Sequence, residues 1–121
     1  MDDTKLGVVE LRFAELIWRE EPLSSGELVK RCAAELEWKK STTYTVLKKL
    51  CDRGLFRNEN GVVTSQVSRR EYLSRQSKRF VEDSFSGSLP AFIAAFSEHN
   101  KLSKKDVQEI LRMIDACETE D

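Results

Sequence analysis

The chain has 121 residues, of which 40% are hydrophobic and 34% are charged, and its formal net charge is −1. This balance is typical of one folded soluble domain, or of one small domain with an appendage, and it excludes a disordered chain. It also excludes a protein that coats nucleic acid without selectivity, because such a protein would be far more basic. No apolar run approaches the ~18 residues of a membrane span, and the acidic start MDDTK is not a signal peptide. We therefore expect a cytoplasmic protein without membrane insertion.

Two helices are predicted in the first part of the chain. A broad apolar surface between Leu6 and Arg19 indicates a first helix that packs on several neighbours. Ser24 and Glu27 then form a capping box, in which each side chain accepts a hydrogen bond from a free backbone amide of the other residue. This box predicts the start of a second helix that continues to about Leu36.

The segment from Trp38 to Gly54, WKKSTTYTVLKKLCDRG, predicts a third helix with two unlike faces. Its apolar face has the i, i+3, i+4, i+7 spacing of a stripe packed on a core, with Thr43, Val46, Leu47 and Leu50. The opposite face carries hydroxyl groups and amines, on Ser41, Thr42, Thr45, Lys48 and Lys49, and the helix starts with Lys39 and Lys40. Lysines neutralise phosphates, and short hydroxyl side chains let a backbone approach base edges.

Charge is concentrated around this third helix. Six Lys/Arg residues and a single acid, Asp52, lie between Trp38 and Arg57, in a chain whose total charge is near zero. A basic helix face is usually just a solvent-exposed surface that binds no ligand. The elements predicted around this helix nevertheless favour a role for helix 39–53 as a DNA-recognition helix.

A β-hairpin is predicted after the third helix. Asn60-Gly61 is the strongest short-range signal for a type I′ turn, and it would join strands at 55–59 and 62–66. Three helices followed by a two-stranded wing is the order of a winged helix-turn-helix, in which the third helix lies in the groove. We thus predict a mainly α fold with a winged-helix DNA-binding domain at residues 1–68.

Three more helices are predicted in residues 69–121. Ser68 and Glu71 form a second capping box, which starts a fourth helix that ends near Phe85. Pro90 fits the first turn of a fifth helix, and Ser103 caps a sixth. We expect this region to be a helical dimerisation domain.

The expectation of a dimer follows from the apolar stripes of these last helices. About fifty residues with narrow apolar faces make a poor independent core. The stripes could fold back on the winged domain, but we favour a two-fold homodimer, which would place two recognition helices about one DNA turn (~34 Å) apart. The predicted dimerisation residues are Leu73, Phe80, Leu89, Phe92, Ile93, Phe96, Val107, Ile110, Leu111 and Ile114.

The sequence offers little for catalysis or for metal binding. Its three cysteines, Cys32, Cys51 and Cys117, are widely spaced and His99 is the single histidine. Zinc sites need clustered ligands, and one histidine does not supply a nucleophile, a base and an orienting group. We expect no enzyme activity, no metal and no cofactor.

An ordered set of motifs over residues 6–113 resembles the penicillinase repressor (BlaI/MecI/CopY) family. The motifs are EL-R-FAELIW in the first helix, WKKSTTYTVLKKL with RGL around the third, then EY, SGSL, KLS and DVQEI. The resemblance implies a homodimeric winged-helix repressor that binds an inverted-repeat operator in double-stranded DNA. The family's DNA contacts lie on the third helix, at positions that match Ser41, Thr42, Tyr44, Thr45 and Lys49.

The resemblance also implies control of resistance genes and, in some members, cleavage by a membrane sensor protease. Ala95-Phe96 replaces the Asn-Phe cleavage pair of the β-lactam-responsive members, so β-lactam induction is not carried over. The cysteine cluster of the copper-responsive members is absent from the tail. The wing keeps Arg57 but has Glu59 at its tip, so we expect weak wing contacts to DNA.

A different class of function is a winged helix that binds a protein partner and regulates it without sequence-specific DNA binding. The acidic pI of about 5.9 favours this alternative. A protein-binding face should expose apolar anchors, and Tyr44 is the one such residue near the outer face of the third helix.

Overall fold

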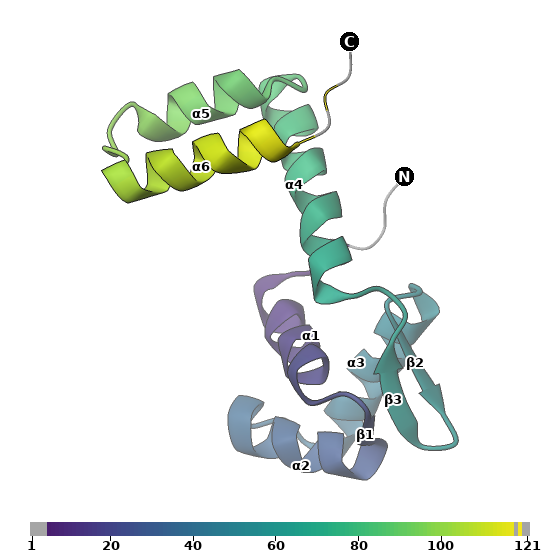
Figure 1. Ribbon diagram of the computed structural model, residues 1–121. Coiled ribbons are helices and arrows are strands. Elements are labelled where there is room, and N and C mark those ends of the chain that lie inside the picture. Colours follow the sequence, from purple (N-terminus) through teal and green to yellow (C-terminus); the bar gives the residue numbers. More distant parts are fainter. Residues whose placement is uncertain (1–4, 118, 120–121) are drawn as a thin grey trace. The chain divides into compact units, whose positions relative to one another are not determined.

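A computed structural model describes residues 5–117 and 119, and over these residues the protein is mainly helical with one small antiparallel sheet (Figure 1). The chain forms two compact units, one ending at Ser77 and one beginning at Lys78. Among the described helices, none combines the length and the apolar composition that crossing a bilayer requires.

The first unit has the element order of a winged helix. Its helices are α1 (Val8–Glu20), α2 (Ser25–Leu36) and α3 (Lys40–Asp52), and its strands are β1 (Leu23–Ser24), β2 (Phe56–Glu59) and β3 (Val62–Ser65). Helix α4 (Arg69–Phe85) follows and continues into the second unit. The predicted fold class is confirmed.

The predicted caps set the helix boundaries. The hydroxyl oxygens of Ser24, Ser68 and Ser103 each accept a hydrogen bond of 3.0 Å from the amide three residues later. Helix α3 ends before Gly54, whose φ of +84° is the left-handed conformation that glycine adopts readily after a helix C-terminus.

The wing is part of a three-stranded sheet with the order β1-β3-β2. Asn60 and Gly61 both have positive φ, as a type I′ turn requires, and Asn58 pairs with Val63 across the hairpin. The amide of Ser25 also donates a hydrogen bond of 2.8 Å to the Gly61 carbonyl, so the wing tip is tied to the start of α2.

Helix α1 lies at the centre of the first unit's core. Phe13 is fully buried, and its ring stacks on that of Trp38, with 5.3 Å between centroids. The Trp18 indole nitrogen donates a hydrogen bond of 3.0 Å to the Val67 carbonyl, and its ring packs on Tyr72 at 5.5 Å. Because Trp38 precedes α3 and Tyr72 belongs to α4, α1 supports the elements on both sides of the wing.

The second unit contains the end of α4, helix α5 (Leu89–Ser97) and helix α6 (Lys104–Ala116). Four phenylalanines, Phe80, Phe85, Phe92 and Phe96, pack with ring centroids 5.6–6.2 Å apart. These aromatic contacts join α4 to α5. Three of the predicted dimerisation residues, Phe80, Phe92 and Phe96, thus have aromatic partners within their own chain.

Candidate nucleic-acid interface

Helix α3 presents the predicted polar face to solvent. Ser41, Thr42, Thr45, Lys48 and Lys49 are all exposed. Thr43, Leu47 and Leu50 are buried on the inner face. The Thr43 hydroxyl donates a hydrogen bond of 3.3 Å to the Lys39 carbonyl. The apolar stripe therefore anchors the helix and leaves its hydroxyl-rich face open.

The N-terminus of α3 is open and positively charged. Lys39 occupies the N-cap position and makes no side-chain capping hydrogen bond. The first amides of a helix have no intrahelical acceptor and carry the positive end of the helix dipole. Lys39 and Lys40 are exposed, and over residues 5–117 neither forms an ion pair. This end of the helix suits an anionic oxygen such as that of a phosphate.

Two side chains on the outer face are held by hydrogen bonds. The Thr45 hydroxyl donates to the Ser41 carbonyl at 2.9 Å, one turn earlier in the helix. The Tyr44 hydroxyl donates to the Ser25 hydroxyl oxygen at 3.2 Å, and 37% of the Tyr44 side chain remains exposed. Tyr44 is therefore oriented by α2 while part of its ring faces solvent.

The cations in the second half of α3 are paired with carboxylates of the same chain. Lys48 lies 2.9 Å from Asp52, and this hydrogen-bonded pair raises the pKa of Lys48. Lys49 lies 2.8 Å from Glu10 of α1, and Arg53 lies 3.8 Å from the other oxygen of that carboxylate. The hydrogen bond from Lys49 is the main reason that the pKa of Glu10 is lowered.

The wing has a similar internal pairing. Arg57 of β2 lies 3.3 Å from Glu59 on the same strand. This pair neutralises Arg57, the one basic side chain of the wing that was predicted to contact DNA. Glu21 fixes the other strand, because its carboxylate accepts hydrogen bonds of 2.8 and 2.9 Å from the amide and the hydroxyl of Ser65.

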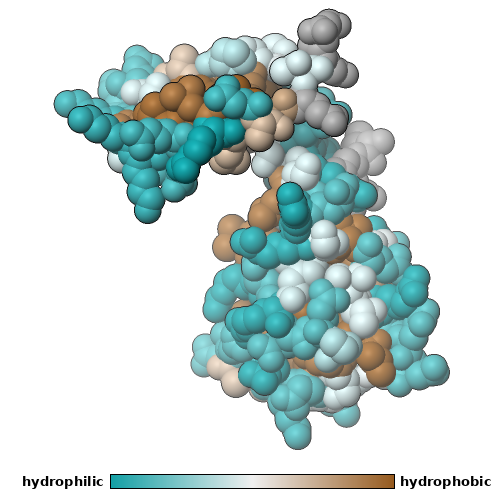
Figure 2. All heavy atoms as spheres, viewed as in Figure 1, coloured by the Kyte–Doolittle hydropathy of each residue, from teal (hydrophilic) through white to brown (hydrophobic). Residues whose placement is uncertain are grey.

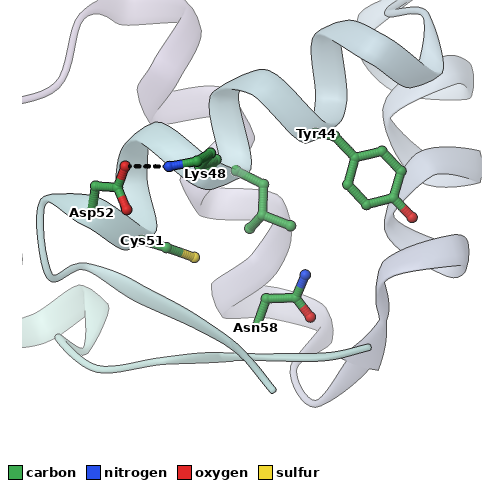
Figure 3. Close-up of a pocket in the computed structure, with 6 residues that line it drawn as sticks. Tyr44, Lys48, Cys51, Asp52 and Asn58 are labelled. Atoms are coloured by element: carbon green, nitrogen blue, oxygen red, sulfur yellow. Dashed lines mark hydrogen bonds and ion pairs between the residues drawn. The ribbon is translucent and has the colours of Figure 1, made fainter. Parts of the chain in front are cut away.

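An open hollow of about 440 Å³ lies between α3 and β2 (Figure 3). Burial raises the pKa of the Cys51 thiol, so this thiol is a weak nucleophile there. Over the described part of the chain, no three His, Cys, Asp or Glu side chains are grouped so that they could hold a metal ion. No local sequence pattern predicts this hollow, because it forms only when the wing packs on α3. The hollow is lined by Tyr44, Leu47, Lys48, Cys51, Asp52 and Asn58.

In the second unit, α5 and α6 expose apolar side chains. Figure 2 shows hydrophobic residues gathered over these two helices. These helices form a groove of about 360 Å³. Its lining is apolar apart from Cys117 and includes Leu89 and Ile93 of α5 and Ile110, Leu111 and Ile114 of α6. Leu89 and Ile93 of α5 thus form one apolar surface with the predicted residues of α6, whereas Phe92 and Phe96 do not line this groove.

Comparison with known proteins agrees with the resemblance found in the sequence. The family model described as penicillinase repressor matches residues 6–116. The chain is also 24% identical over 110 residues to the penicillinase repressor of Bacillus licheniformis, an alignment that covers 88% of this chain and 86% of that protein. The chain belongs to the penicillinase repressor family, a family of transcriptional repressors.

Proposed function

We propose that the protein is a homodimeric repressor that binds an inverted-repeat operator in double-stranded DNA through the outer face of α3. The observation that carries this proposal is the open N-terminal half of α3, where exposed hydroxyl side chains lie beside Lys39 and Lys40, two lysines that form no ion pair with any residue that the structure describes. Such a repressor acts in the cytoplasm, where it has access to its operator.

The two halves of α3 have different roles in this proposal. Lys39 and Lys40 neutralise phosphates at the start of the helix, where the dipole adds to their charge. The hydroxyl groups of Ser41, Thr42 and Thr45 face base edges. The wing adds little, since Arg57 is paired with Glu59.

Replacing Lys39 and Lys40 together by alanine is expected to weaken binding to all duplexes alike. Each protomer loses two phosphate contacts and the dimer loses about four, which should flatten the slope of log K against log salt by about 3.6 and lower affinity by roughly 1,000-fold at about 0.15 M salt. A gel-shift series over salt measures both quantities. Lys30→Ala with Lys5→Ala removes the same charge from exposed sites outside α3, and an equal loss in this control would contradict the assignment.

Thr42→Ala and Thr45→Ala are expected to reduce discrimination between operator and random duplex. A lost contact to a base edge or to a thymine methyl group should cost about 1 kcal/mol or more of selectivity while leaving random-duplex affinity unchanged. Competition binding with both duplexes tests this. An equal fall in affinity for both duplexes would assign these hydroxyl groups to phosphates instead.

The proposed dimer uses the apolar surface of α5 and α6. Leu111 and Ile114 are each more than half exposed in the single chain. Burial of such apolar side chains is favourable by about 25 cal/mol per Å² of buried surface. A two-fold axis lets the apolar surface of one protomer pack against the same surface of the second protomer.

The function is tested by selecting the duplexes that the protein retains from a random pool. Repressor function predicts an inverted repeat whose half-sites are about one helical turn apart, and tight binding to this repeat over a shuffled duplex. Equal affinity for both would instead favour the protein-interaction module considered from the sequence.

A further inference from the structure

We infer that Glu10 competes with DNA phosphate for the Lys49 ammonium group and thereby limits the affinity of α3 for every duplex. This inference rests on the proposed function, because it concerns how strongly the same helix binds DNA. It assigns a role in DNA binding to a residue of α1 that does not belong to the recognition helix.

The geometry shows why Glu10 is a fixed acceptor. One carboxylate oxygen accepts a hydrogen bond of 3.1 Å from the Gly7 amide, at the start of α1. The other oxygen lies 2.8 Å from the Lys49 nitrogen. Only 22% of the Glu10 side chain is exposed, against 55% for Lys49. The carboxylate is thus held in place by its own helix, while the lysine is the partner that can leave.

The charge state of the pair strengthens this argument. The pKa of Glu10 is lowered, first by the hydrogen bond from Lys49 and then by the one from the Gly7 amide. Glu10 therefore stays ionised at neutral pH, and the positive charge of Lys49 is locally cancelled. A phosphate must replace the carboxylate before it gains a contact with Lys49.

In the neighbouring pair of Lys48 and Asp52, the carboxylate is not held in place in this way. Their side chains are 78% and 66% exposed, and they lie four residues apart on the same helix surface. Exposed pairs of this kind contribute little and exchange readily with solvent. Glu10 differs because it comes from another helix and is anchored by a backbone amide.

Glu10→Gln is the direct test in the full-length protein. Glutamine can still accept the hydrogen bond from the Gly7 amide, so the start of α1 is preserved. In the dimer the two freed Lys49 side chains should add about two phosphate contacts, which steepens the salt slope by about 1.8 and tightens binding roughly 30-fold at about 0.15 M salt. Both selected and random duplexes should show this gain.

Glu15→Gln is the matched control. Glu15 is also on α1 and also forms an ion pair, at 2.9 Å from Arg69, so the change in net charge is the same. Equal gains for Glu10→Gln and Glu15→Gln would mean that only net charge matters, and would overturn the inference. Lys49→Gln removes the cation that Glu10 holds. Adding Glu10→Gln to this variant should therefore raise its affinity for DNA no more than Glu15→Gln raises the affinity of the unsubstituted protein. A larger rise in affinity would also overturn the inference.

The unsubstituted protein supplies a second readout that does not depend on any variant folding. The NMR resonances of the Lys49 side chain should shift when random duplex displaces Glu10, and unchanged resonances in the bound state would contradict the inference. If the unsubstituted protein binds no duplex at all, the proposed function fails and this inference fails with it. Binding without a difference between the two glutamine variants removes only the role of Glu10.

Discussion

Replacing Leu111 and Ile114 together by glutamate is expected to turn the proposed dimer into a monomer and to weaken operator binding by about 100- to 10,000-fold. Both side chains line the apolar groove of α5 and α6, where a charge would lose its hydration against a second copy. In the single chain they are 55% and 56% exposed, so the glutamates are accommodated in the folded monomer. Light scattering measures the mass against 13.9 kDa for one chain.

The large loss of affinity comes from the loss of simultaneous binding to two half-sites. Affinity for an isolated half-site should stay unchanged, because α3 itself is not altered. Gln108→Glu on α6 is the control, since its exposed side chain is not part of the groove. A double-glutamate variant that remains dimeric would show that the interface lies elsewhere.

Phe13→Ala is expected to lower the free energy of unfolding of the first unit by about 3–5 kcal/mol. Phe13 is fully buried and stacks on Trp38, the residue that leads into α3. Its removal leaves a cavity beside Trp38, next to the start of α3. Since a domain is stable by only about 5–15 kcal/mol, this loss removes a large share of the unit's stability and should weaken DNA binding near physiological temperature.

Urea unfolding followed by tryptophan fluorescence provides the measurement. The chain has two tryptophans, Trp18 and Trp38, and both belong to the first unit, so their signal reports that unit alone. Val8→Ala on the same helix is the control, because Val8 is 81% exposed and should change stability by about 0.5 kcal/mol or less. A loss below about 1 kcal/mol for Phe13→Ala would contradict the central position of α1.

Local signals in the sequence predicted most of the fold. A capping hydroxyl needs only the amide three residues later, so Ser24, Ser68 and Ser103 mark helix starts without any tertiary information. The turn at Asn60-Gly61 is equally local. The polar face of α3 was predicted from periodicity, and its exposure agrees with that prediction.

Features that depend on distant contacts were not predicted. Strand β1 has two residues and exists because Leu23 and Ser24 pair with β3, about forty positions later in the chain. The ion pair of Glu10 with Lys49 likewise joins two helices that are far apart in sequence. The sequence therefore indicated which cations lie near α3, but not which of them are already neutralised.

The bare N-cap of α3 has a consequence for attempts to make this protein more robust. A serine at position 39 would cap the helix and, by general experience with such caps, add about 1 kcal/mol of stability. Its hydroxyl oxygen would also occupy a backbone amide that we assign to an incoming phosphate, and a cation would be lost. At position 39, a residue that stabilises the helix is therefore one that weakens the proposed phosphate contact. A variant selected for thermal stability alone would bind its operator less tightly.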